Sequence, residues 1–556
     1  MDLTVGVGDG RLMAGSPPNN DSTRRADHRQ TADLTNGTIR RTPRRWGWLL
    51  TALVPAIFIG YFFVYPVARI LTLGLSELSF GSSGLEARLI RVGWFTVWQA
   101  TASTVLTLLF AAPMTWAVSR FEFRGRRLAT ALVTVPFVLP TVVVGTAFVA
   151  LGWRDSIWAI LAAHVFFNTA IIVRTVGTLW ARLDPDILGA ARVLGAGPWE
   201  TFRRVTLPLL KPAIAAATSI VFLFTFTSFG VVLIIGGFEY ATLEVEIYRQ
   251  AVSFFDLPLA AALALVQLVG VTAALYGYSR YQDRHTSSWA LSSDSSRVKP
   301  RGGARAGVVL AVGGTLSLLA IPIGVLVARS LGTDSYRALF QDDAVVGVPI
   351  ESAANSFRFA AVAMVIAVVI GVMSAAVIAG RSGRLSRWFD LTLMLPLGTS
   401  AVTIGFGFIV ALGWPVDLRA SFVLVPIAHA LIAVPFVVRI TVPTLKAIPP
   451  DLHEAAAVLG TSRGRVWWRI DFPIVAKAAL VGSAFAFVIS LGEFGATSFV
   501  ARPATTTMPV MIFRLLSRPG QQSLGMAMAL AVALAAITAA VVMWIDRLQV
   551  GEVGSF

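Results

Sequence analysis

Residues 190–208 read AARVLGAGPWETFRRVTLP, and residues 455–473 read AAAVLGTSRGRVWWRIDFP. Both stretches are polar and basic, and each interrupts a long apolar run of the same chain. The residues around these two stretches therefore decide whether the chain has one continuous fold or a repeated one.

The composition is that of a membrane protein with several spans. Of the 556 residues, 56% are hydrophobic and 14% are charged, and the mean hydropathy is +0.73. Soluble domains carry about 25% charged residues. The apolar runs reach about 20 residues or more, enough to cross a hydrocarbon core of about 30 Å as helices, which satisfy their own backbone hydrogen bonds there. The expected fold class is an all-α polytopic membrane protein.

The distribution of positive charge along the chain predicts which loops are cytoplasmic. The net charge is +16, and the Arg residues gather in short loops between apolar runs, which is typical of cytoplasmic loops. This pattern favours membrane lipid over nucleic acid as the partner of the positive charge. The chain contains no Cys, which excludes disulfides, thiolate metal sites and a Cys nucleophile.

Twelve spanning helices are expected, six in each half of the chain. They lie at about 46–74, 93–119, 129–153, 157–180, 212–238, 257–280, 306–328, 354–380, 388–413, 419–446, 474–500 and 524–546. The expected domains are a disordered cytoplasmic N-terminus at 1–45, a six-helix repeat at 46–280, a cytoplasmic linker at 281–305, a second six-helix repeat at 306–546 and a cytoplasmic tail at 547–556. Both termini are then cytoplasmic, and the protein is a multi-pass protein of a bacterial plasma membrane.

The two halves are an internal duplication. Position 455 aligns with position 190, and the same offset of 265 residues aligns His164 with His429 and Arg174 with Arg439. A slightly different offset aligns VALGW at 149–153 with VALGW at 410–414. Because six helices is an even number, both copies face the same way, and they form parallel repeats as in known transporters.

Each quoted stretch is expected to form a short helix outside the membrane, between the fourth and fifth spans of its half. Ala and Leu favour a helix, and Gly195 and Gly460 can end it in a left-handed conformation. Pro208 and Pro473 suit the first turn of the next span. An interfacial amphipathic helix that only joins two spans is the alternative.

Both stretches resemble the EAA motif of permease subunits of bacterial ABC importers, in which EAA is followed by three residues, Gly, nine residues, Ile, one residue and Leu-Pro. The resemblance covers about residues 90–545. The second copy matches the motif at Glu454, Ala455, Ala456, Gly460, Ile470 and Pro473, with Phe472 in place of Leu. The first copy matches at Ala190, Ala191, Gly195, Leu207 and Pro208, with Val205 in place of Ile and Gly189 in place of Glu.

The resemblance implies the partners. In that family, this loop is a coupling helix that docks on an ATPase subunit, so residues 189–208 and 454–473 would each bind one of two ATPase copies. The chain has no GxxxxGK[ST] loop, so it is not the ATPase, and ATP and Mg²⁺ belong to the partner. A substrate-binding protein would dock on the extracytoplasmic side. No catalytic residue and no resident cofactor are expected.

The fusion of two halves resembles thiamine and ferric-iron permeases. The stretches LAAHVFFN at 161–168, FTSFGVVLIIGG at 226–237 and 241–268 are similar to the thiamine type. The substrate expected from this resemblance is thiamine or a phosphorylated thiamine, with ferric iron as the alternative. SLGEFGATSF at 490–499 also resembles molybdate and sulfate permeases, which leaves an anion as a further alternative.

A few polar residues within spans are candidates for the pathway. Glu493 is expected in the outer half of a span, and Ser228 takes its place in the first copy. A carboxylate facing the pathway would suit a cation, and the alternative is a structural Glu paired with a neighbouring helix, for example with His429. His164 and His429 have no acidic or Cys residue at ligand spacing, so hydrogen bonds between helices are favoured over a metal site.

Two interpretations remain to be compared with the structure. Glu244, Glu246 and Arg249 precede the sixth span and are interpreted as a solvated outer loop, with contact to a binding protein as the alternative. An ion-coupled secondary transporter is the rival function, since it also uses parallel repeats. That rival predicts a chain of acidic residues within spans and gives no reason for two EAA-like loops, and no constellation for an enzyme is present.

Overall fold

The computed structural model describes residues 45–80, 85–285, 297–332, 334–342, 347–380, 383–419 and 421–550. The predicted N-terminal segment 1–45 lies almost wholly outside the described residues, as do residues 286–296 of the linker and 551–556 of the tail. Contacts divide the chain into two units, Met1–Leu50 and Thr51–Phe556, and every helix from η1 onward belongs to the second.

The described residues form helices, with a single isolated bridge between Phe121 and Val298. After α2 (Arg45–Ile59), the helices of the first half are η1 (Gly60–Val64), α3 (Tyr65–Phe80), α4 (Leu85–Arg120), α5 (Arg126–Val138), α6 (Thr141–Ala150), α7 (Ile157–Ala181), α8 (Pro185–Val193), α9 (Pro198–Thr201), η2 (Phe202–Thr206), α10 (Leu207–Phe226), α11 (Gly230–Gly236), α12 (Leu243–Tyr248), η3 (Arg249–Phe254) and α13 (Leu257–His285).

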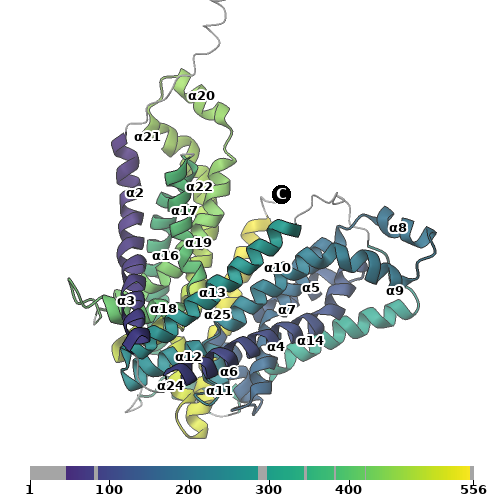
Figure 1. Cartoon of the computed structure of the whole chain (residues 1–556), viewed down its shortest axis with the longest axis horizontal. Coiled ribbons are helices and arrows are strands. Elements are labelled where there is room, and N and C mark those ends of the chain that lie inside the picture. Colours follow the sequence, from purple (N-terminus) through teal and green to yellow (C-terminus); the bar gives the residue numbers. More distant parts are fainter. Residues whose placement is uncertain are drawn as a thin grey trace, which may run out of the picture. The chain divides into compact units, whose positions relative to one another are not determined.

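The helices of the second half from α16 onward correspond to those of the first half from α4 onward (Figure 1). Its helices are α14 (Gly303–Ser330), α15 (Ser335–Ala338), α16 (Glu351–Ala379), α17 (Arg384–Gly398), α18 (Ala401–Ala411), α19 (Leu424–Lys446), α20 (Pro450–Val458), α21 (Arg463–Val466), η4 (Trp467–Asp471), α22 (Phe472–Gly492), α23 (Thr497–Val500), η5 (Pro503–Thr505), α24 (Met508–Leu516) and α25 (Gln521–Val550).

Ten helices in the described part of the chain are long and apolar enough to span a membrane, or twelve if each of two bent pairs is one span. The two helices predicted at 129–153 and 388–413 are not continuous. The first is broken into α5 and α6, which meet at 97°, and the second into α17 and α18, which meet at 102°. Pro140 forces the residue before it into an extended conformation, and Ser400 caps α18 by accepting a hydrogen bond from the Thr403 amide.

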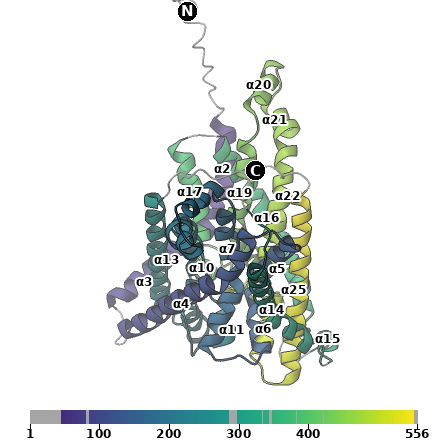
Figure 2. The same cartoon turned by 90° about the vertical axis from the view of Figure 1, so that its right-hand side faces the viewer.

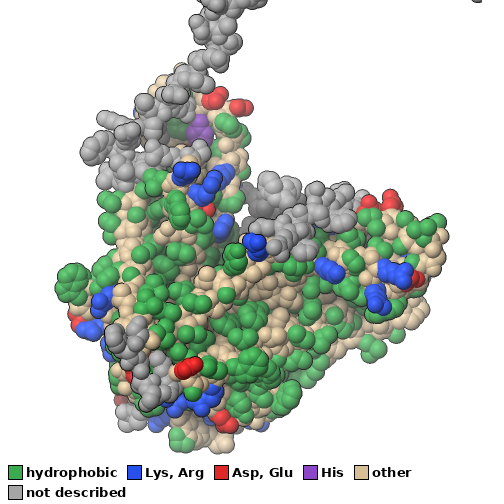
Figure 3. All heavy atoms as spheres, viewed as in Figure 1, with side chains coloured by type: hydrophobic (Ala, Val, Ile, Leu, Met, Phe, Trp, Pro, Cys, Tyr) green, Lys and Arg blue, Asp and Glu red, His purple; other side chains and the backbone are tan. Residues whose placement is uncertain are grey.

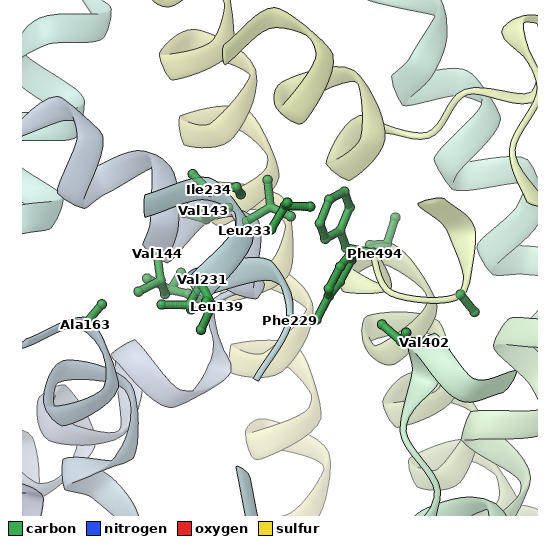
Figure 4. Close-up of a cluster of buried hydrophobic side chains, with 14 of the residues drawn as sticks. Leu139, Val143, Val144, Ala163, Phe229, Val231, Leu233, Ile234, Val402 and Phe494 are labelled. Carbon is green, nitrogen blue, oxygen red and sulfur yellow. The ribbon is translucent and has the colours of Figure 1, made fainter. Parts of the chain in front are cut away.

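The predicted spans at 212–238 and 474–500 are also too long. Helix α10 ends at Phe226 and α22 ends at Gly492, and a short break leads from each into α11 or α23. At each break, backbone N–H and C=O groups lose their helical hydrogen-bond partners. Because lipid cannot form hydrogen bonds with these groups, polar side chains in the same region do so. The two breaks lie next to each other where the halves meet, at the stacked rings of Phe229 and Phe494 (Figure 4).

The first helix of each half packs against the other half. In the first half, α3 lies along α13 and also packs on α18 of the second half. In the second half, α14 packs on α25 and also on α4, α5 and α6 of the first half. Figure 2 shows α14 beside α5, α6 and α25. The two halves are therefore interlocked along their length, in addition to their contact at the breaks.

Candidate functional site

The two polar loops have the same backbone. In each, a nine-residue helix, α8 or α20, ends at a glycine with a left-handed backbone: φ is +85° at Gly195 and +67° at Gly460. The amide of Ala196 donates to the carbonyl of Ala191 at 3.1 Å, and the amide of Thr461 donates to that of Ala456 at 3.0 Å. These bonds are a Schellman-type end, which requires the positive φ that glycine adopts without a Cβ clash.

The end of each short helix presents a pair of apolar side chains to the outside of the molecule. Val193 and Leu194 are 89% and 87% exposed, and their equivalents Val458 and Leu459 are 87% and 81% exposed. Buried Leu188 anchors the first helix to the protein, and buried Ala456 lies on the inner side of the second. The two copies therefore expose the same apolar pair at the same place.

The rest of the motif lies where the sequence predicts it. Ala190, Ala191, Ala455 and Glu454 belong to the short helices, and a π-helical turn, η2 or η4, follows each loop and contains Val205 or Ile470. Leu207 and Phe472 begin the next spans, and Pro208 and Pro473 occupy the first turn of α10 and α22. A Cβ at Gly189 would have no atom within 4 Å, so the missing Glu of the first copy is not excluded by packing.

The loops differ in how they are tied to the spans. In the second copy, Nε2 of His453 lies 2.8 Å from Oδ1 of Asp471, which joins α20 to η4. The equivalent positions in the first copy are Leu188 and Thr206, which line a cavity instead. The backbone is therefore duplicated, whereas its side-chain supports are not.

The predicted hydrogen bonds of the two buried histidines are confirmed. Nδ1 of His164 lies 2.9 Å from Oγ of Ser103, and Nε2 lies 2.9 Å from Oγ of Ser228. In the second half, Nδ1 of His429 lies 2.6 Å from Oγ of Ser490. Each histidine on α7 or α19 thus holds the region where α10 or α22 ends.

Glu493 lies immediately after α22, in the break, rather than within a span as predicted. Its Oε2 is 3.3 Å from Nε2 of His429, which confirms the predicted alternative of a structural pair. The carboxylate also accepts hydrogen bonds from the amides of Ala496 and Thr497 at 2.8 and 2.9 Å, and from the hydroxyl of Thr497. Glu493 is buried and stabilises its own loop, whereas the Ser228 hydroxyl in the first copy bonds to His164.

An aromatic cluster lies where the two halves meet. The rings of Phe229 and Phe494 stack with their centroids 5.3 Å apart, one from each half (Figure 4). Phe513 packs on Phe494 at 5.6 Å, and Tyr248 packs on Phe229 and on Phe499, each at 5.4 Å. The cluster joins the two breaks to α12 and α24, and it contains only van der Waals contacts that can separate without leaving a buried charge.

A cavity of about 690 Å³ adjoins this cluster and is lined by both halves. Its aromatic walls are Tyr248, Phe255, Phe499 and Phe513, and its charged residues are Asp417, Arg419, Arg502 and Arg514. Hydrogen bonds from Arg419 lower the pKa of the Asp417 carboxyl to about 2, so this pair is neutral overall. The cavity therefore offers aromatic surface and the positive charge of two further arginines.

The interpretation of 244–249 as a solvated loop is wrong. Glu244 and Glu246 are buried in α12. Glu244 accepts a hydrogen bond from Gln267 of α13, and another at 2.9 Å from Ser400 of the second half. Glu246 accepts from Gln250 and lies 3.8 Å from Arg88 and 3.7 Å from Arg249. No local pattern in the sequence predicts this burial, because the partners come from distant segments.

Comparison with known proteins shows which family this chain resembles. The model of the family "Binding-protein-dependent transport system inner membrane component" matches residues 103–287 and again residues 367–550. The thiamine transport system permease protein ThiP of Brucella abortus is 28% identical over 493 residues, covering 84% of this chain and 89% of that protein. ThiP of Salmonella typhimurium is 26% identical, covering 85% and 92%. The sulfate transport system permease protein CysT of Escherichia coli is 30% identical over 240 residues, covering 36% and 86%.

Proposed function

This chain belongs to the family of binding-protein-dependent transport system inner membrane components, as a fused pair of such domains in one multi-pass permease of an ABC importer, and we propose that it couples to two ATPase subunits and carries thiamine or a phosphorylated thiamine. ATP and Mg²⁺ bind to the ATPases, and a substrate-binding protein delivers the substrate from the opposite side. Both termini and both polar loops are cytoplasmic in this arrangement.

The observation that carries the coupling is the exposed apolar pair at the end of each short helix, Val193-Leu194 and Val458-Leu459. Burying such a side chain contributes about 1.5–3 kcal/mol to the free energy of binding. Each pair can therefore stabilise the docking of its loop in a groove of a partner. The two loops have one backbone geometry, which suits two copies of a single ATPase. A linker between spans would have no reason to expose four large apolar side chains to water.

The transport step follows from the contacts between the halves. Movement of the two ATPases toward each other would pull α8 and α20, and the halves would rock about their interlocked helices. The stacked pair Phe229 and Phe494 would separate and reopen the middle of the molecule. The buried networks of His164 and His429 keep the region after α10 and α22 rigid, so that each half moves as a body.

The substrate assignment rests on the relatives and on the cavity. The ThiP proteins of Brucella abortus and Salmonella typhimurium align with most of this chain. Glu493 is occupied by its own loop, so it offers no site for a cation. The cavity beside the aromatic cluster combines aromatic walls with Arg502 and Arg514, which suits a ligand that has aromatic rings and a phosphate group. These features favour a phosphorylated thiamine over the free cation.

Two measurements test the proposal. Cells with and without the gene are compared for uptake of labelled thiamine, thiamine monophosphate and ferric iron. Loss of the uptake of the thiamine compounds alone supports the substrate, and loss of iron uptake alone would move the chain to the ferric group.

For coupling, the tagged chain is purified with its ATPase. The variants Glu454→Arg and Gly460→Arg are expected to abolish both co-purification and uptake. Survival of both activities in both variants would overturn the coupling assignment.

A further inference from the structure

A second cavity, of about 560 Å³, lies behind the first polar loop. It is bounded by the ends of α4 and α7, by α8 and by the segment from α9 to η2. Three indoles, those of Trp116, Trp180 and Trp199, line it together with the guanidinium groups of Arg120 and Arg192. Figure 3 shows Lys and Arg side chains near the end that Figure 1 labels α8 and α9.

The acidic residues next to this cavity are bound to other arginines. Glu122 pairs with Arg126 at 3.1 Å, and Glu200 pairs with Arg204 at 2.9 Å. More positive charge lies close by, because the amide of Val298 donates to the carbonyl of Arg120 and so brings the basic residues on either side of Val298 to the end of α4. Among the described residues, no ion pair is formed by either guanidinium of the cavity. The cavity therefore combines apolar walls with an excess of positive charge.

Three residues of this cavity have different counterparts in the second half. Leu445, Ala457 and Gly464 occupy the positions of Trp180, Arg192 and Trp199. The space that the first half leaves open is bridged there by the pair of His453 and Asp471. Because α20 has the same backbone as α8, neither the loop nor its apolar end requires the indoles and guanidiniums of the first copy. The indoles of Trp180 and Trp199 pack on Phe202, with centroids 5.8 and 5.6 Å away, so the two guanidinium groups are what the packing of the first loop leaves unexplained.

We propose that this cavity binds the phosphate of an acidic phospholipid from the membrane leaflet on the side of the polar loops. Guanidinium groups bind phosphate by paired, charge-assisted hydrogen bonds, and indoles favour the level of lipid headgroups. Basic pockets between spans on the cytoplasmic side are sites for such headgroups.

The partly exposed surface of α4 beside the cavity favours a lipid over a soluble phosphate ester. Leu109, Ala112, Trp116 and Arg120 lie on one face of α4 at helical spacing, and Leu109 is 63% exposed. An acyl chain can follow this face from the cavity toward the hydrocarbon core while the phosphate remains between Arg120 and Arg192. The lipid then joins the end of α4 to α8 and braces the first loop, as His453 and Asp471 brace the second.

The experiment is native mass spectrometry of the purified full-length chain titrated with phosphatidylglycerol. The variants Arg192→Ala and Trp180→Leu introduce the residues of the second half, so the backbone should accept them. Arg192→Ala is expected to weaken binding about fivefold, which is the usual loss for one basic residue at a lipid headgroup. Arg469→Ala, which removes the same charge from the second loop, is the matched control and should leave binding unchanged.

Three results would overturn the proposal. Equal losses in Arg192→Ala and Arg469→Ala would indicate general charge attraction without a site. Equal affinity for phosphatidylcholine would remove the selectivity for an acidic headgroup. Equal affinity for soluble glycerol phosphate, with the same dependence on Arg192, would assign the site to a free phosphate ester. Thermal unfolding of each variant shows whether a loss of binding reflects loss of the fold.

Discussion

The two polar loops of this permease differ in their supports but not in their backbone or their exposed ends. Both short helices have nine residues, both end at a left-handed glycine, and both expose a Val-Leu pair. The second is tied by His453 and Asp471, whereas the first faces a cavity lined by indoles and arginines. After the duplication, the backbone and the exposed ends of the loops stayed the same in both copies, and the side chains that support the loops diverged.

The largest expected effect comes from the shared feature. Leu194→Arg and Leu459→Arg each place a charge where an apolar side chain would be buried by an ATPase. Because burial of a charge without a partner costs several kcal/mol, we expect each variant to lower uptake by about a hundredfold or more. Uptake of labelled substrate and co-purification of the ATPase measure this. If only one of the two variants lost activity, the two loops would not be equivalent in coupling.

The two halves also differ in the polar residue after their fifth span. Glu493 accepts hydrogen bonds from two buried amides and lies near His429, whereas Ser228 contacts His164 alone. Glu493→Ala leaves those amides unsatisfied and should lower the free energy of unfolding by about 3 kcal/mol, against about 1 kcal/mol for Ser228→Ala. Thermal unfolding in detergent compares the two. Equal losses in the free energy of unfolding would show that the additional hydrogen bonds of Glu493 do not stabilise the fold.

Much of the architecture could be predicted from the sequence, because apolar length and a repeated polar loop are local signals. The breaks at Pro140 and Ser400 could not, because the apolar composition continues across them. The burial of Glu244 was missed for a different reason: an acidic side chain is read as solvated unless its partners are known, and Ser400 lies 156 residues away. The cavity behind the first loop was missed because its three indoles lie far apart in the sequence, and only the packing of α4, α7 and α9 brings them together.

Arg249 and Arg514 occupy equivalent positions in the two halves and have different surroundings. Arg514 lines the cavity beside the aromatic cluster, whereas Arg249 lies near Glu246 and over the rings of Phe238 and Phe254. Arg514→Gln should lower uptake of thiamine monophosphate about tenfold, because one charge-assisted contact to phosphate is lost. Free thiamine should be affected less. Arg249→Gln is the matched control, and an equal loss in both variants for both substrates would remove the proposed role of Arg514 in selectivity.

The smallest expected effect comes from restoring the missing acid of the first loop. Gly189→Glu gives α8 the residue that α20 has at Glu454, in a place where a Cβ meets no neighbouring atom. Replacing Gly within a helix also stabilises that helix by about 0.5–1 kcal/mol. We therefore expect an intact fold and uptake changed by no more than about twofold, with more ATPase retained during purification. A strong loss of uptake would mean that the first loop meets its ATPase through a surface that excludes the acid. The two loops would then bind their partners differently, despite their common backbone.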